Sequence, residues 1–247
     1  MNGESIVLVK GISGSGKSTR VYLFLDFLKS LGMELKPYMF TTLDGKSKQV
    51  GVYSEDFNMV FVGKYYEVGG IGRWQGYDIM TSRLCKAEGL SYFLEKTAEQ
   101  GHNVLIDGAG TTASWRLRPL DLCGTAGFTN ILHVRYDYRD DQWGEYCDRI
   151  TYRSGKLPKG DSMWHKHRTF QHDFERAVQE GNEVIEAGGN VVLHDMPYDA
   201  PVWDLGVHIF DFFEMPELGS EFKLHCEGSD YIQKKNSYKT FNDGKEK

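Results

Sequence analysis

The stretch 11–18 reads Gly-Ile-Ser-Gly-Ser-Gly-Lys-Ser and fits the pattern GxxxxGKS/T. Glycines allow the backbone N–H groups of such a turn to point inward around an anion, at the positive end of the following helix. In this pattern Lys17 reaches the β and γ phosphates of a nucleotide, and the Ser18 hydroxyl ligates Mg²⁺. The motif predicts that ATP and Mg²⁺ are bound by Ser13, Gly14, Ser15, Gly16, Lys17, Ser18 and Thr19.

A second candidate for phosphate chemistry is Asp107, which ends the apolar run 103–107. If this run is a parallel strand, the carboxylate lies at the carboxyl edge of the sheet, beside the metal and the γ-phosphate. The sequence has no Asn-Lys-x-Asp guanine-recognition motif and no strand ending in Asp-Glu. It therefore favours a kinase over a nucleotide-driven switch or motor.

Two arginines, Arg149 and Arg153, are four residues apart on a predicted helix. Residues at this spacing share one helix face. Such a pair can close over the triphosphate and neutralise the charge that spreads onto the transferring phosphoryl group. The alternative is a salt-bridged helix surface, with Glu145 one turn before Arg149.

The phosphoryl acceptor is expected to bind at a glycine-rich stretch, 69–76, and the residues that follow it. Aromatic side chains there can stack on a base, an amide can read a base edge, an arginine can hold a phosphate, and an aspartate can accept a hydroxyl proton. The residues predicted for these roles are Arg73, Trp74, Gln75, Tyr77 and Asp78.

A structural role is the alternative for these residues, with Trp74 and Tyr77 as core anchors and Asp78 as a helix N-cap. Asp44, in a turn after a predicted strand, competes with Asp78 for the role of catalytic base. We favour Asp78 as the base and Asp107 beside the metal, although the two assignments could be exchanged.

The elements that position these residues are predicted from hydrophobic periodicity. Strands are expected at 5–10, 35–41, 103–107, 130–135 and 190–194, with an edge strand at 207–213. Helices are expected at 17–31, 78–100, 145–153 and 161–187. Two alternating stretches, 49–53 and 59–65, predict an inserted β-hairpin outside the main sheet. Alternating strands and helices indicate an α/β fold with a doubly wound parallel sheet.

We expect one domain over residues 1–247. Its hairpin and acceptor-recognition insertion would span about 45–78, its lid and basic segment about 139–170, and a mobile tail 228–247. No run of about 18 apolar residues is present, so no membrane segment is expected and the predicted location is the cytoplasm. The sequence indicates no protein partner.

Charge is distributed unevenly along a chain whose formal net charge is −6. Residues 149–168 carry six Arg or Lys against one acid, whereas residues 195–221 carry seven acids and no Arg or Lys. The negative net charge excludes a protein that binds nucleic acid over its whole surface. The basic segment predicts a polyanion site of limited size. A solvated charged face is the alternative.

The motifs GISGSGKST, VLIDGAG and CDRITYRSGK resemble the phosphate loop, the acidic third-strand motif and the lid of the P-loop kinase superfamily. More narrowly, the stretch GGIGRWQGYD and the chain length resemble phage-encoded 5-hydroxymethyluracil DNA kinases. The resemblance implies a nucleotide-kinase-like P-loop NTPase fold. It also implies phosphorylation of the hydroxymethyl group of a modified pyrimidine in DNA, in the host cytoplasm if the gene is phage-encoded.

Two other functions stay open at this point. One is a kinase for a free nucleoside or nucleotide, or for a polynucleotide 5′-hydroxyl. The other is an ATP-driven switch or nucleic-acid-remodelling module. An acceptor base inside DNA has to leave the base stack. The basic segment, with Tyr152 and Trp164, is then the expected DNA groove, together with Trp115, Arg116 and Arg118.

Overall fold

The central strand is β1 (Ser5–Gly11), in which all seven residues are buried. It pairs in parallel with β5 (Asn103–Asp107) on one side and with β6 (Asn130–Asp137) on the other. The computed structural model describes residues 5–12, 14–65, 84, 86–108, 117–154 and 160–229. Burial on both faces explains why these strands read as continuous apolar runs rather than as alternating ones.

The sheet has seven strands in the order β2-β3-β4-β5-β1-β6-β7 within the described ranges. β7 (Asn190–Pro197) continues the parallel arrangement at one edge, next to β6. At the other end lie β4 (Met59–Val62), β3 (Ser47–Ser54) and the edge strand β2 (Leu35–Thr41). β3 runs antiparallel to both of its neighbours, so the sheet is mostly parallel.

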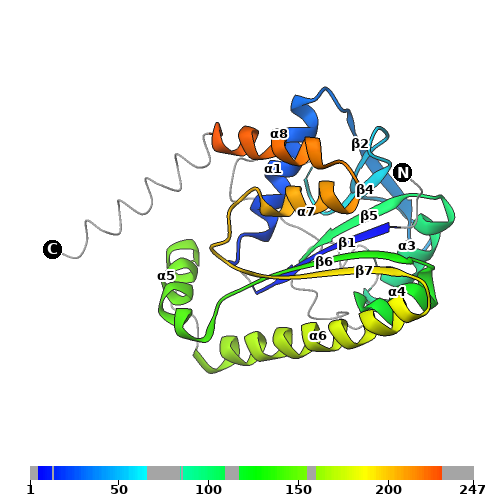
Figure 1. Cartoon of the computed structure of the whole chain (residues 1–247). Helices are drawn as coiled ribbons and strands as arrows, with labels where there is room; N and C mark the ends of the chain where they lie inside the picture. The colour runs from blue at the N-terminus through cyan, green and yellow to red at the C-terminus, as the bar shows by residue number, and fades with distance from the viewer. Residues whose placement is uncertain are drawn as a thin grey trace.

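Helices cover both faces of this sheet (Figure 1). One face packs against α1 (Lys17–Ser30), α7 (Asp204–Phe212) and α8 (Pro216–Glu227). The other packs against α3 (Lys86–Glu99), α4 (Pro119–Ala126) and the long α6 (Gly160–Glu186). A short 3₁₀ turn, η2 (Asp140–Gln142), and α5 (Trp143–Ser154) follow the carboxyl end of β6. Two helix-covered faces confirm the predicted α/β class.

The prediction that the hairpin lies outside the main sheet is wrong. β4 pairs in parallel with β5, from Met59 opposite Asn103 to Val62 opposite Ile106. All four residues of β4 are buried, with Met59 and Phe61 in the core under α1 and with Val60 and Val62 in the core under α3. A strand that is apolar on both faces has to be covered on both, so the hairpin extends the sheet.

The prediction of an edge strand at 207–213 is also wrong, because this stretch belongs to α7. Leu205 and Ile209 lie four residues apart and are both fully buried, which is the helical period. A Cβ atom at Gly206 would lie 2.1 Å from the Phe222 ring, so the glycine lets α7 approach α8. This close helix pair depends on α8, which a short periodicity window does not include.

Among the described helices, none has the length and apolar character needed to cross a bilayer. The part of the predicted helix 78–100 that the structure describes as helical is α3. Of the predicted tail 228–247, residues 230–247 lie outside the described residues.

Candidate phosphate-binding site

Backbone geometry at two glycines shapes the turn between β1 and α1. Gly11 has a φ of 137°, and a Cβ atom there would lie 1.9 Å from the carbonyl oxygen of Tyr136 on β6. Gly16 caps α1 in the left-handed conformation, with a φ of 83°. Glycine adopts both conformations without steric cost, which side-chain-bearing residues do not. The glycines of the motif therefore fix the path of the loop, whose Ser13 lies outside the described residues.

Lys17 lies across the loop that precedes it. Its Nζ donates hydrogen bonds to the carbonyl oxygens of Gly11 at 2.7 Å and Ile12 at 2.9 Å. The side chain is 7% exposed. The first helical turn thus places an ammonium group beside the loop, at the N-terminal end of α1, where the helix dipole also favours an anion.

Ser18 and Asp107 meet at the carboxyl edge of the sheet, as expected. The Ser18 hydroxyl donates to Asp107 Oδ2 at 2.7 Å, and Asp107 Oδ1 accepts a hydrogen bond from the Tyr65 hydroxyl. Asp107 is fully buried at the end of β5. A hydroxyl oxygen and a carboxylate are the ligand types that Mg²⁺ prefers, so this pair fits a magnesium site. The sequence does not indicate the contact of Tyr65 with Asp107.

Ser15 carries the polar atom that best fits a ligand in the loop. Its backbone N–H donates to the Ile12 carbonyl at 3.3 Å. Its Oγ is buried and has no hydrogen-bond partner among the described residues. Buried hydroxyl groups without a partner are uncommon in folded proteins. An anion held by the loop would supply the missing partner.

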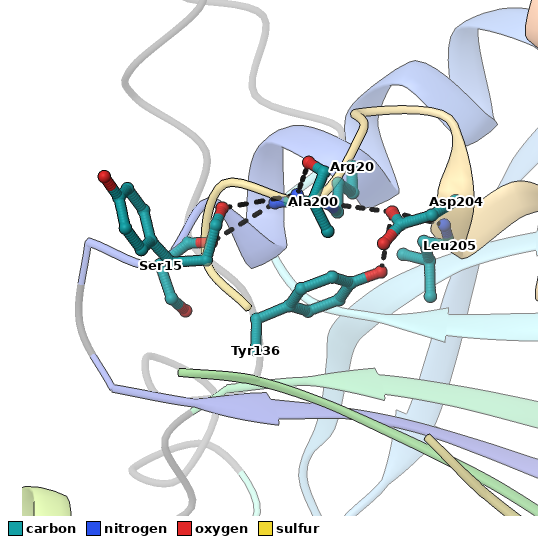
Figure 2. Close-up of polar contacts among 7 residues, drawn as sticks. Ser15, Arg20, Tyr136, Ala200, Asp204 and Leu205 are labelled. Atoms are coloured by element: carbon teal, nitrogen blue, oxygen red, sulfur yellow. Dashed lines mark hydrogen bonds and ion pairs between the residues drawn. The ribbon is translucent and has the colours of Figure 1, made fainter. Parts of the chain in front are cut away.

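Arg20 lies outside the motif, and its hydrogen bonds hold the loop in place (Figure 2). Its Nη1 donates to the Ser15 carbonyl at 3.2 Å, and its Nε forms an ion pair with Asp204 of α7 at 3.0 Å. Its Nη2 donates to the carbonyl of Ala200, and the guanidinium lies 4.1 Å from the centre of the Tyr136 ring. One buried side chain thereby joins the loop to α7 and β6.

Asp204 is the anion at the centre of this network. Its Oδ1 accepts from Arg20, from the Tyr136 hydroxyl at 2.9 Å and from the Leu205 backbone N–H at 2.7 Å (Figure 2). Burial raises the pKa of Tyr136 well above its usual value, so the phenol stays protonated and donates to the carboxylate. The network is fixed in one hydrogen-bonding pattern.

Aromatic side chains cover the outer side of the loop. The Tyr138 hydroxyl donates to the Gly14 carbonyl at 3.2 Å, and the Tyr138 ring stacks on Tyr198 with 4.0 Å between centroids. Arg149 of α5 donates to the Tyr138 hydroxyl at 3.5 Å and lies 5.1 Å from the Tyr198 ring centre. Of the predicted arginine pair, Arg149 is therefore next to the loop. α5 includes Arg153, whose side chain is not described.

The predicted acceptor site lies outside the described residues, namely Arg73, Trp74, Gln75, Tyr77 and Asp78. The competing base, Asp44, is described and accepts a hydrogen bond from Thr42 in the turn between β2 and β3. It also lies 3.6 Å from Lys46 Nζ and 3.5 Å from Lys48 Nζ. The Thr42 hydrogen bond lowers the pKa of Asp44. These contacts are those of a structural turn aspartate.

The basic segment is described only in part. Arg168 and His172 are exposed on α6, and His172 contacts Glu175 at 3.2 Å. Arg118 forms an ion pair with Glu180 of α6 at 3.0 Å. The side chains of residues 152–167 lie outside the described ones, as do Trp115 and Arg116. The predicted DNA groove thus stays a prediction.

Fold and loop together define an α/β protein with a glycine-rich loop between β1 and α1, beside a buried aspartate. The chain belongs to the 5-hmdU DNA kinase 2 family, whose model matches residues 3–201. The chain is similar to the 5-hmdU DNA kinase 2 of Salmonella phage ViI. The two are 25% identical over 233 residues, covering 83% of this chain and 75% of the relative. The resemblance inferred from the residues is thereby confirmed at the level of the family.

Proposed function

We propose that this protein transfers the γ-phosphoryl group of ATP to the hydroxymethyl group of 5-hydroxymethyluracil in DNA. Membership of a DNA kinase family makes the chain a phosphotransferase. The observation that carries the proposal is that the family match, residues 3–201, includes the loop with Lys17 as well as the Ser18–Asp107 pair. We place the reaction in the cytoplasm, that of the host if the gene is phage-encoded.

The loop residues fit a triphosphate, since the Ser15 hydroxyl is buried without a partner among the described residues and the Lys17 ammonium lies beside the loop. In the proposed complex, Lys17 exchanges its contacts with loop carbonyls for contacts with the β and γ phosphates. Ser18 and Asp107 would hold Mg²⁺, whose charge neutralises the phosphate oxygens when it is bound. Gly14, Gly16 and Thr19 complete the proposed cradle.

The chemistry at the acceptor is assigned to Asp78. Its carboxylate accepts the proton of the hydroxymethyl group while the oxygen of that group forms the new bond to phosphorus. The bond between the γ-phosphorus and the β–γ bridging oxygen breaks, and ADP leaves with the electron pair. Arg149 and Arg153 neutralise the charge that develops on the transferring group. The family match also includes Asp78.

The base has to be taken out of the DNA stack before transfer. We assign its stacking to Trp74 and Tyr77, its edge to Gln75, and a flanking phosphate to Arg73. Basic residues of the segment 149–168 would hold the strand by charge, which is the general source of sequence-independent DNA affinity.

The test is transfer of labelled γ-phosphate from ATP to three acceptors in parallel. These are DNA with 5-hydroxymethyluracil, unmodified DNA with a 5′-hydroxyl, and a mixture of free nucleosides and nucleotides. We expect label only in the modified DNA. Label only in the 5′-hydroxyl DNA or in the free nucleotides would replace the proposed acceptor. Phosphate release without any labelled acceptor would indicate an ATP-driven switch instead.

A further inference from the structure

A pocket on the face of the sheet opposite α1 begins where the phosphate loop begins. It is lined by Lys10 and Gly11 of β1, His133 and Arg135 of β6, and Asp173 and Phe174 of α6. Lys10 and Arg135 are direct neighbours on the paired strands. Figure 1 shows that α6 runs along β6 and β7. The pocket is partly open to solvent, and the cavity itself is small, about 10 Å³.

His133 is the least satisfied buried side chain of this pocket. It is 1% exposed, and neither ring nitrogen has a hydrogen-bond partner in the part of the chain that the structure describes. One face of the imidazole contacts Phe174, with 5.2 Å between the ring centroids. A buried imidazole without partners is costly, because it loses its hydrogen bonds to water and gains none. A polar occupant of the pocket would supply a partner for this ring.

Arg135 adds a second unused donor. Its Nη2 donates to Asp137 at 2.7 Å, but its Nε lacks a hydrogen-bond partner within the described ranges and lies 3.6 Å from Asp195. Its guanidinium lies 5.3 Å from the ring centre of Phe174. The ring thus lies beside the cation, and among the described residues the Nε–H group has no hydrogen bond shorter than its ion-pair distance to Asp195.

Lys10 adds a second cation to a lining that also includes the carboxylate of Asp173. Its side chain is 6% exposed, and its Nζ donates to the Leu117 carbonyl at 3.3 Å. Burial lowers the pKa of Lys10 to about 8, and Asp173 opposes this effect. At neutral pH the ammonium is therefore still charged, with more N–H groups than the one acceptor the described residues provide. Ammonium, guanidinium and imidazole donors together suit an oxyanion and disfavour a cation.

The position next to Gly11 relates this pocket to the reaction. The Gly11 carbonyl accepts from Lys17 on the loop side, while Gly11 also lines the pocket. A DNA strand that presents a base to the γ-phosphate has to pass close to the loop, and it carries a phosphate at every nucleotide. The enclosed part of the pocket has room for about one water-sized group. A single phosphate oxygen can enter it while the rest of the phosphodiester stays at the mouth.

We propose that the pocket formed by Lys10, His133 and Arg135 binds a non-bridging oxygen of one phosphodiester beside the acceptor base. This inference rests on the proposed function for the identity of the strand. The pocket would fix the register of the strand, so that one nucleotide, and not its neighbour, faces the phosphate loop.

Binding of fluorescently labelled DNA containing 5-hydroxymethyluracil, followed by anisotropy without ATP, tests the site directly. We expect Lys10→Met to weaken binding about tenfold and to reduce the dependence of log K on log salt by about one phosphate contact. Lys36→Met is the matched control. Lys36 is half-exposed on the edge strand β2, at the other end of the sheet, and pairs with Glu55 at 2.9 Å. It should leave both quantities unchanged.

Replacing single phosphates of the DNA by uncharged methylphosphonates locates the contact. One linkage should weaken binding to the native protein, and at that linkage the Lys10→Met protein should show no further loss. His133→Leu, which removes the two unpaired nitrogens and keeps an apolar side chain of similar size, serves as the variant least prone to unfold. It should lose affinity at the same linkage.

Native affinity in both pocket variants would overturn the proposal and leave water as the occupant. Equal losses at every methylphosphonate position would do so too, since they indicate a general charge effect. Inorganic phosphate is the alternative ligand, and it would be identified if phosphate displaced DNA from the native protein but not from the pocket variants. Failure of the proposed function would give another result. DNA binding and its dependence on the methylphosphonate position would persist, but no label would be transferred to the modified base.

Discussion

Buried nitrogen donors on the two faces of the sheet are hydrogen-bonded to different degrees. On the α1 face, every guanidinium nitrogen of Arg20 donates, to Asp204, to Ser15 and to the carbonyls before α7. On the α6 face, both nitrogens of His133 lack hydrogen-bond partners within the described residues, and Arg135 Nε has only a longer ion pair with Asp195 at 3.6 Å. Both sets are more than 90% buried and lie beside the same loop.

This difference distinguishes residues that support the loop from residues that are available to bind a ligand. A buried guanidinium whose nitrogens all donate holds one arrangement and gains nothing from a ligand, which suits Arg20 as the support of the Ser15 carbonyl. Buried polar groups without hydrogen-bond partners remain destabilising until a ligand or water bonds to them. The same residue types can therefore have opposite effects on stability, depending on whether the fold completes their hydrogen bonds.

Removing the Arg20 guanidinium is expected to give the largest effect on stability. Arg20→Met would leave the Asp204 carboxylate buried beside Tyr136 without its cation. Breaking a buried ion pair on one side costs about 3–5 kcal/mol of unfolding free energy. Urea denaturation measures this loss.

The control is Arg139→Met. Arg139 is 47% exposed and lies 3.3 Å from Asp195, so its removal should cost less than about 1 kcal/mol. Equal losses in the two variants would mean that the Arg20 network contributes no more than a surface pair.

Lys17 and Lys10 give the second test, because they are equally buried at the two ends of the loop. Lys17→Met is expected to reduce kcat for phosphoryl transfer about 100- to 1000-fold, since in the proposed function Lys17 donates to the transferring group. Lys10→Met should change mainly the KM for DNA. Steady-state kinetics with modified DNA distinguish the two effects.

Lys29→Met, at the exposed end of α1, controls for loss of a charge on the same helix. If Lys17→Met kept native turnover, the loop would bind an anion without taking part in transfer. If Lys10→Met lost turnover as severely, the pocket would be part of the catalytic site and not a contact for the strand.

The sequence predicts the loop side of this comparison because its signals are local. The glycines, Lys17 and Ser18 lie within one motif, and Asp107 ends an apolar run whose strand character is evident from composition. Parallel pairing then brings Asp107 to the same edge. The contact between Ser18 and Asp107 follows from topology alone, without any knowledge of side-chain packing.

The contacts of Arg20 could not be predicted in the same way. Arg20 and Asp204 are separated by 184 residues, and Asp204 belongs to α7, which the periodicity misassigned as a strand. Lys10, His133 and Arg135 do leave a signal, since they interrupt two apolar runs at positions that share one face of a strand. Polar residues that face the core from neighbouring buried strands therefore indicate a candidate site.

The pH dependence of stability tests whether the Lys10 amine is desolvated in the DNA-free protein. Burial lowers the pKa of Lys10 to about 8, from about 10.5 in the unfolded chain. Between these values the unfolded state binds more protons, so the unfolding free energy should rise with pH, by about 3 kcal/mol in total. The groups that face this amine are Asp173, Glu180, Arg118, His133 and Arg135.

Urea denaturation from pH 7 to 11 provides the measurement, with Lys10→Met as the reference. Tyrosine and cysteine titration contributes equally to both proteins and cancels in the difference. A rise of the same size in both proteins would show that Lys10 is not desolvated. Bound DNA should move the rise to higher pH, because a phosphate beside the ammonium favours its charged form.

The smallest expected effect comes from His133→Leu, compared with His225→Leu. His225 Nε2 lies 3.2 Å from Asp26 Oδ2, whereas His133 has two unpaired nitrogens among the described residues. Removing unsatisfied buried groups should raise the unfolding free energy by about 1–2 kcal/mol, and the His225 variant should lose up to about 1 kcal/mol. Thermal unfolding at pH 7 should show shifts of opposite sign.

The difference between the His133→Leu variant and the native protein should widen in acid. Burial, with Lys10 and Arg135 nearby, lowers the pKa of His133 well below 6.5. Below the unfolded value of about 6.5, the unfolded native chain binds a proton that the folded state excludes, so native stability falls as the pH falls. The leucine variant lacks this loss. A destabilised leucine variant would mean that His133 is already satisfied by water inside the pocket, and the contrast with Arg20 would then disappear.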